Sequence, residues 1–243
     1  MRPAKLRRSL GWIALPVVLP LVGAFCIYSA TGRDDSYITN WVAERLADHG
    51  DLINYNGERV EQSSSLLHVV VVAAARRLTG LPTSTLGVAL SALFGGVAIW
   101  LAHRFARRMD EGISIAVAWL VATVPGLLYW SLSGLETTLA TCTMVAVGAA
   151  HAIPTEQGRL KSLGGWLAAT FAYLSVRPEA PLVLGAALGG SLIVLAARRW
   201  RARTRQSDTI LAAARLRLEF VRAVLALGAA GLLLIWRHAY FGA

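Results

Sequence analysis

Long apolar runs alternate along the chain with short polar segments that are rich in arginine. A transmembrane helix requires about 20 consecutive, mainly apolar residues, and seven runs reach or approach that length. They cover residues 10–30, 83–102, 113–132, 137–153, 163–176, 180–197 and 221–236. The pattern predicts an all-α, polytopic helical membrane protein, with about seven transmembrane helices in a single membrane domain over residues 1–243.

The first run, residues 10–30, has two interpretations. It follows a cluster of basic residues and ends in Tyr28-Ser29-Ala30, which loosely resembles a signal-peptide cleavage site. The apolar part of a signal peptide is usually about 7–15 residues long, and this run is longer. We therefore expect an uncleaved first span, with a cleaved signal peptide as the alternative.

Residues 31–82 are expected to form a loop with two short helices. One has an apolar face at helical spacing, made of Ile38, Trp41, Val42 and Leu46. An amphipathic helix with a tryptophan is expected to lie along the membrane surface. The apolar run 66–75 is short for a span, and such stretches are more often interfacial. We expect a juxtamembrane helix there, in which His68 is packed or interfacial.

Composition narrows the class of protein. Apolar residues make up 56% of the chain and charged residues 16%, with a mean hydropathy of +0.54. Soluble proteins carry about 25% charged residues, so an ordinary soluble domain is excluded, and the hydrophobicity also excludes a disordered chain. The net charge of +10 comes from arginines scattered between apolar runs, not gathered on a soluble face. We therefore expect the lipid bilayer as a partner and no nucleic acid.

The distribution of charge predicts the orientation. Residues 198–222 contain eight arginines and two acids, whereas residues 31–65 contain seven acids and three basic residues. Because cytoplasmic loops are enriched in Lys and Arg, we place the N-terminus in the cytoplasm and the loop 31–82 outside the cell (plasma) membrane. Arg76 and Arg77 are exceptions, since this topology leaves them on the outer side.

Several ionisable residues fall at the predicted outer ends of the spans. They are Asp34, Asp35, Glu58 and Glu61 in the first loop, Glu136 after the third span, Arg177 and Glu179 after the fifth, and Arg237 after the last. Ionisable groups near membrane depth are costly and are often functional. Their position on one face predicts a site, and the alternative is a solvated acidic loop with helix caps.

A carboxylate at this interface can act as a general base. In sugar transfer from a lipid phosphate, it would deprotonate the acceptor hydroxyl, while Arg177 and Arg237 stabilise the leaving phosphate. A divalent metal, Mg²⁺ or Mn²⁺, could bridge acids and phosphate, because hard cations prefer oxygen ligands; the spacing does not demand one. The chain has no GxxxxGK[ST], HExxH or GxSxG motif, which removes the chemistries that those motifs carry.

Four blocks, taken in order, carry a family resemblance. They are Asp34-Asp35-Ser36-Tyr37-Ile38, the turn 57–66, Ser133-Gly134-Leu135-Glu136-Thr137 and Arg177-Pro178-Glu179. The set resembles the N-terminal portion of bacterial GT-C superfamily membrane glycosyltransferases. The closest likeness is to actinobacterial arabinofuranosyltransferase-like members, which overlap with RgtA/B/C/D-like and protein mannosyltransferase-like proteins.

The resemblance implies an inverting glycosyltransferase that takes sugar from a polyprenyl-phosphate donor on the outer face. The acceptor would be a glycan, lipid or protein of the cell envelope. Asp34 and Asp35 are the implied catalytic carboxylates. Substrate or phosphate binding is then expected of Glu58, Glu61, Glu136, Arg177, Glu179 and Arg237.

The chain also departs from that pattern. Gln62, Ser64 and Ala180 stand where glycine, asparagine and glycine are expected. The block 236–242 resembles one that continues into a Pro-Asn-Thr stretch, which is not reached here. We expect a truncated product, a fragment or half of a split enzyme, whose missing part a partner chain would supply. The alternative functions are a transporter or lipid flippase, which would show ionisable residues or broken helices at mid-membrane, and a non-catalytic accessory subunit.

Overall fold

The computed structural model describes residues 14–19, 22, 34–59, 61, 63, 65–152, 159–201 and 206–242. Within these ranges the chain is helical and contains no strand, as predicted. The predicted first span lies mostly outside the described residues. Its described part, 14–19, is helical, and the Val17 carbonyl oxygen lies 2.6 Å from where a Cβ on Gly96 would stand. The glycine therefore permits close approach of this segment to the second predicted span.

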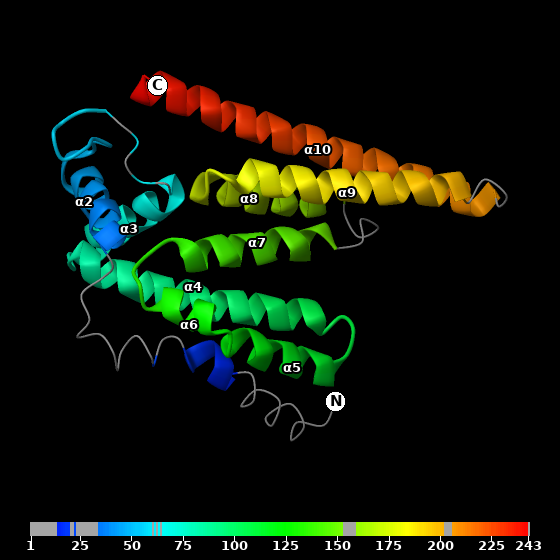
Figure 1. Ribbon diagram of the computed structural model, residues 1–243, viewed down its shortest axis with the longest axis horizontal. Coiled ribbons are helices and arrows are strands. Elements are labelled where there is room, and N and C mark those ends of the chain that lie inside the picture. Colours follow the sequence, from blue (N-terminus) through cyan, green and yellow to red (C-terminus); the bar gives the residue numbers. More distant parts are fainter. Residues whose placement is uncertain are drawn as a thin grey trace.

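Helices α4, α7, α8, α9 and α10 run side by side, and α2 and α3 lie across one end of them (Figure 1). The described helices are α2 Asp34–His49, α3 Leu66–Thr79, α4 Thr83–Ala106, α5 Glu111–Ala122, α6 Pro125–Ser131, α7 Thr137–His151, α8 Arg159–Val176, α9 Ala180–Arg201 and α10 Gln206–Phe241. Five of the predicted spans thus coincide with, or lie inside, a helix.

Three of the described helices are long and apolar enough to cross a membrane. They are Thr83–Ala106, Ala180–Ala197 and Ala213–Phe241, and α5 with α6 would make a fourth if the bent pair forms one span. Helix α7 has 15 residues, and the apolar part of α8, Leu163–Val176, is also short. The structure therefore supports a helical membrane protein with three or four candidate spans, and the count of about seven is not confirmed.

The predicted span 113–132 is two helices and not one. Helices α5 and α6 meet at an angle of 62°. Pro125 is at the start of α6, and Val124 before it has an extended ψ of 115°. A proline disfavours helical geometry in the residue that precedes it, so the Val124-Pro125 step ends the first helix.

Helix α10 is longer than the predicted last span. It has 36 residues and continues through Arg215 and Arg217 at one end and Arg237 at the other. Much of the basic stretch 198–222, which the charge pattern places on the cytoplasmic side, is therefore helical, and the polar residues expected after the span lie in the final turns of α10.

Helices α2 and α3 pack together with the start of α4, around Val42, Ala43, Val69, Val72 and Leu86. The predicted helix is confirmed, but its buried face is centred on Ala43, and Ile38 at the edge of the predicted apolar face is 41% exposed. The apolar face of α2 thus contacts protein.

Contacts with α2 account for Arg76 and Arg77, the two arginines that the predicted topology leaves on the outer side. Arg76 lies 2.9 Å from Glu44 and 2.8 Å from Asp48, and the guanidinium lowers the pKa of the Asp48 carboxyl by hydrogen bonding. Arg77 donates to the carbonyl oxygens of Ala47 and Leu46, which end α2. Cations stabilise a helix C-terminus, so both side chains have local structural partners.

Candidate functional site

One end of the helix bundle gathers most of the segments that carry the predicted site residues. Helices α2 and α3, the α6–α7 loop, the α8–α9 turn and the end of α10 meet there (Figure 1). These segments are far apart in sequence, and the predicted topology placed all of them on one side. The local contacts show which side chains come together.

The α6–α7 loop packs between α2 and α4. Gly134 has a φ of +75°, and a Cβ there would lie 3.4 Å from Val88 Cγ2 and 3.6 Å from Ser36 Cβ. The Ser91 hydroxyl of α4 donates to the Leu135 carbonyl oxygen over 2.8 Å. These contacts hold Glu136, the next residue, in a buried position with 6% exposure.

Arg177 joins this loop to the α8–α9 turn. Its Nη1 lies 3.6 Å from Glu136 Oε1, and its Nε lies 3.7 Å from Glu179 Oε1. Its Nη2 donates to the Thr137 hydroxyl over 3.3 Å. Glu136 is almost enclosed, whereas Arg177 is partly exposed, so the guanidinium remains accessible from one side. The structure therefore brings together three of the predicted residues, Glu136, Arg177 and Glu179.

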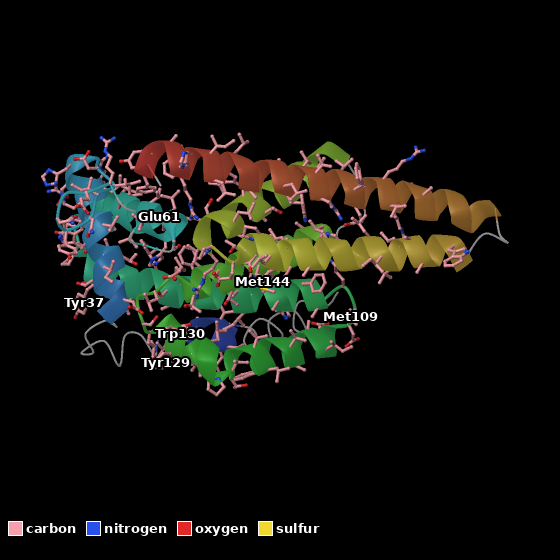
Figure 2. The ribbon with its side chains drawn as sticks, turned by 45° about the horizontal axis from the view of Figure 1, so that its top comes forward. Tyr37, Glu61, Met109, Tyr129, Trp130 and Met144 are labelled. Atoms are coloured by element: carbon pink, nitrogen blue, oxygen red, sulfur yellow. The ribbon has the colours of Figure 1, made fainter. Side chains whose placement is uncertain are left out.

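A second ion pair lies between the first loop and α10. Arg237 Nη2 is 3.2 Å from Glu61 Oε1, and Figure 2 labels Glu61 beside the C-terminal end of α10. Burial raises the pKa of Glu61, and Arg237 opposes that rise. Tyr240 accepts a hydrogen bond from the Leu52 amide over 3.2 Å, and its ring lies 5.4 Å from the Arg59 guanidinium carbon. The last turns of α10 are thus fastened to this loop.

A buried polar face on α2 was missed by the sequence analysis. Ser36, Thr39 and Asn40 are at most 6% exposed. The Thr39 and Ser63 hydroxyl oxygens are 3.3 Å apart, and Asn40 Oδ1 is buried without a hydrogen-bond partner in the described part of the chain. These three residues are spaced like one face of a helix, but a pattern of apolar residues does not reveal a buried polar face.

His68 lies in α3 and is fully buried, so its interpretation as a packed histidine is confirmed. Its backbone N–H donates to Ser65, which caps the helix. Neither ring nitrogen has a hydrogen-bond partner among the described residues. Burial lowers the pKa of the imidazole to about 4, and the negative charge of Glu136 opposes that shift. The ring is therefore neutral near pH 7.

The predicted catalytic aspartates are at the first turn of α2. Asp35 is exposed and precedes buried Ser36, while the side chain of Asp34 lies outside the described part of the structure. Glu58 is exposed in the turn before Glu61, where its backbone bonds to Asn54 and Asn56. Among the described residues, no group of three or more His, Cys, Asp or Glu side chains could hold a metal ion.

No family model matches this chain, and no curated protein matches it. The resemblance to glycosyltransferases therefore remains a prediction from the four sequence blocks.

Proposed function

We propose that the chain is a GT-C-type membrane glycosyltransferase module. It transfers a sugar from a polyprenyl-phosphate donor to an envelope glycan, lipid or protein acceptor on the extracytoplasmic face of the plasma membrane. The observation that supports this function is the gathering of two acid–arginine clusters, Glu136–Arg177–Glu179 and Glu61–Arg237, at one end of the bundle. The helix that begins at Asp34 lies at that same end.

In the proposed reaction an aspartate carboxylate at the start of α2 takes the proton of the acceptor hydroxyl. The acceptor oxygen then forms a bond to the anomeric carbon of the sugar, and the bond from that carbon to the phosphate oxygen breaks with inversion. The polyprenyl phosphate leaves with the electron pair. Its growing charge would be stabilised by Arg177, and by Arg237 on the other cluster.

In this proposal, only the carboxylates of Asp34 and Asp35 would bind a divalent cation, Mg²⁺ or Mn²⁺. The other carboxylates of the site fit it poorly, because Glu136 and Glu179 share Arg177 and Glu61 already pairs with Arg237.

The test replaces each aspartate in turn. Asp34→Asn or Asp35→Asn should lower transfer from a polyprenyl-phosphate sugar by about 10²-fold or more, measured in membranes with equal amounts of protein. Asp51→Asn is the matched control, since Asp51 is exposed in the same loop and should leave transfer unchanged. Undiminished transfer in both the Asp34 and Asp35 variants would contradict the catalytic assignment.

The bend between α5 and α6 favours one other function, a transporter or lipid flippase, since transporters use discontinuous helices. However, residues 113–131 contain no charged side chain, whereas a transported polar group needs ionisable partners. Purified protein in liposomes distinguishes the two functions, because a flippase would move a fluorescent lipid between leaflets without any sugar acceptor.

A further inference from the structure

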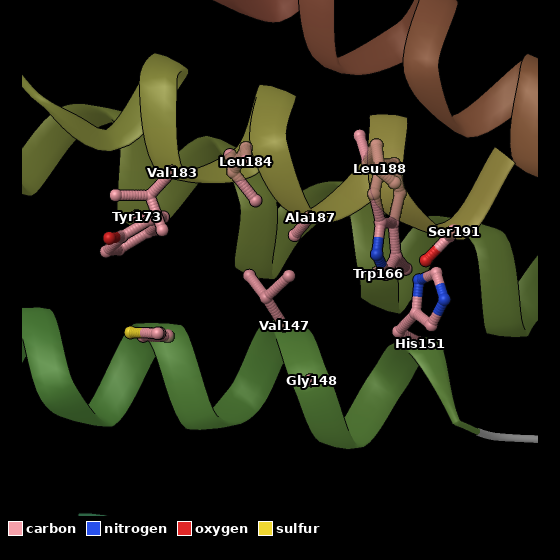
Figure 3. Close-up of a pocket in the computed structure, with 11 residues that line it drawn as sticks. Val147, Gly148, His151, Trp166, Tyr173, Val183, Leu184, Ala187, Leu188 and Ser191 are labelled. Atoms are coloured by element: carbon pink, nitrogen blue, oxygen red, sulfur yellow. The ribbon is translucent and has the colours of Figure 1, made fainter. Parts of the chain in front are cut away.

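A second candidate site lies between α7 and α9, beside α8 (Figure 3). It is a slot of about 210 Å³ whose walls are mostly apolar, with Val147, Leu184, Ala187 and Leu188 among them. Figure 3 shows His151, Trp166 and Ser191 together at one end of the slot. Tyr173 lies at the opposite end, so the slot is apolar along its length and carries polar groups at both ends, with His151, Trp166 and Ser191 together at one of them.

A larger pocket of about 480 Å³ shares His151 and Ser191 with the slot. Its wall includes Arg215 and Glu219 of α10. Because the two pockets share wall residues, the larger pocket adjoins the apolar slot and forms a charged mouth beside it. The mouth lies toward the end of the bundle where α7 ends and α10 begins, opposite the end that carries Glu61 and Arg237.

The mouth carries a net positive charge, because the Glu219 carboxylate is balanced by Arg222 and Arg215 adds a second cation. Glu219 is buried and lies 2.9 Å from Arg222, which is itself 2% exposed and 3.3 Å from His151 Nδ1. Arg222 therefore balances the Glu219 carboxylate inside the protein. Arg215 lines the mouth from an exposed position on the same helix, and its charge is available to an anion.

Trp166 supplies an independent sign of a ligand site. The side chain is fully buried in the slot wall, and its indole N–H has no acceptor among the described residues. A buried indole N–H normally has a hydrogen-bond partner, and an unmade buried hydrogen bond costs free energy. The slot thus offers a hydrogen-bond donor in its wall, and the adjoining pocket offers the Arg215 cation.

We infer that this site binds an anionic phospholipid. One acyl chain lies in the slot, the phosphate faces Arg215, and an ester or phosphate oxygen accepts the Trp166 N–H. Basic pockets between membrane helices are known to hold anionic headgroups. From Met144 to His151 the slot follows α7 for about 10 Å, which fits within one leaflet of a hydrocarbon core about 30 Å thick. The inference does not depend on sugar transfer.

The experiment uses quenching of tryptophan fluorescence by lipids with brominated acyl chains. The purified chain is titrated with brominated phosphatidylglycerol or brominated phosphatidylcholine. The quenching of Trp166 is the difference between the quenching of the wild-type chain and that of a Trp166→Phe variant. Brominated phosphatidylglycerol should quench Trp166 at a concentration about tenfold lower than brominated phosphatidylcholine, which is the effect of one charge-assisted hydrogen bond.

Two pairs of variants locate the ligand. Arg215→Gln should raise the phosphatidylglycerol concentration needed by about tenfold, while Arg217→Gln, on the same helix but outside the pocket, should not. Ala187→Phe should fill the slot and abolish quenching, whereas Ala186→Phe, outside the slot, should have no effect. Circular dichroism confirms that all four remain helical.

Three results would overturn the inference. One is equal quenching by the two lipids, and another is equal losses in the Arg215 and Arg217 variants. The third is displacement of the brominated lipid by a polyprenyl phosphate at a far lower concentration than by phosphatidylglycerol, which would assign the slot to the sugar donor.

Discussion

Gly134 shows how a single residue positions the candidate site. Its φ of +75° is in the left-handed region, which costs other residues roughly 1–2 kcal/mol. The short α6–α7 loop needs this conformation to turn between α2 and α4 and to bury Glu136. The glycine in Ser133-Gly134-Leu135-Glu136-Thr137 is therefore required by the backbone, whatever role the glutamate has.

Gly134→Ala should lower the free energy of unfolding by about 1–2 kcal/mol. The added methyl would meet Val88 and Ser36 at ordinary van der Waals distance, so the cost comes from the backbone conformation. The measurement is denaturant unfolding in detergent. Gly126→Ala is the control, because a Cβ there meets nothing within 4 Å, and it should be neutral or slightly stabilising.

His68 predicts a pH dependence of stability. Its pKa is about 4 in the folded protein against 6.5 for the free side chain, so between these values the unfolded chain binds a proton that the folded chain does not. Stability is therefore full above pH 6.5 and falls as the pH drops toward 4, by on the order of 3 kcal/mol. Unfolding measured across this range checks the prediction.

His68→Leu should remove this pH dependence, since the side chain that titrates is gone. It should cost little at pH 7, because neither ring nitrogen has a hydrogen-bond partner in the described structure. His49→Leu, at an exposed position, should keep the wild-type profile. A His68→Leu protein that still loses stability between pH 6.5 and 4 would assign the effect to other groups.

At the residue scale the sequence indicated the charged partners better than the buried ones. Glu136, Arg177 and Glu179 could be grouped because charges are rare next to apolar spans. The burial of Ser36, Thr39 and Asn40 was not predicted, because the burial of a polar side chain depends on which helix covers it. That contact is set by the packing of α2 on α3 and α4.

Helices α5 and α6 show how one residue pair decides an element. Hydropathy is continuous across residues 113–132, so the pattern predicted one span. Pro125 follows Val124, and the helices on either side of this step meet at 62°. The break was visible in the sequence, but kinked spans that contain proline also occur, so the proline could not decide between a kink and two helices.

Pro125→Ala should reduce the bend, because Val124 could then adopt helical geometry. Spin labels at Ile113 and Tyr129, both exposed, would measure it by their separation. A continuous helix would separate the two backbone positions by about 24 Å, and the bent pair by less. An unchanged separation would mean that contacts with α4 and α7, and not the proline, impose the angle.

Helix α10 illustrates the opposite case, since the predicted span covers only part of a longer helix. The stretch 206–222 is rich in Ala, Leu and Arg, which are strong helix formers, but its charges lower the hydropathy below that of a span. Hydropathy reports whether a segment suits lipid, and helix propensity reports whether it is helical. At the ends of a span the two signals differ, because a segment there can be helical and still too polar for lipid.

At the scale of the whole molecule, α10 has a spacing of charges that suits a bilayer. Arg217 and Arg237 are 20 residues apart in one helix, which is about 30 Å, the thickness of a hydrocarbon core. Glu219 and Arg222 lie between them but are buried against His151, so they do not face lipid. This spacing supports a spanning α10, while the orientation still rests on the distribution of arginines.

The proposed topology predicts which loops react from each side of the membrane. After Cys26 and Cys142 are changed to alanine, Asn56→Cys should be labelled by an impermeant thiol reagent in intact cells. Arg107→Cys should be labelled only after the membrane is opened. Both positions are exposed in the structure. The reverse result would invert the orientation and place the acid–arginine clusters in the cytoplasm.

Because α10 is one continuous helix, a tilt at one contact is transmitted along its whole length. Arg222 contacts His151 near the middle of the helix, and Tyr240 holds the first loop at its C-terminal end, about 27 Å away along the axis. A tilt of about 5° around the first contact would move the tyrosine by about 2 Å, enough to break its hydrogen bond with Leu52. Small displacements at the phospholipid mouth would therefore be amplified at the opposite end of the molecule.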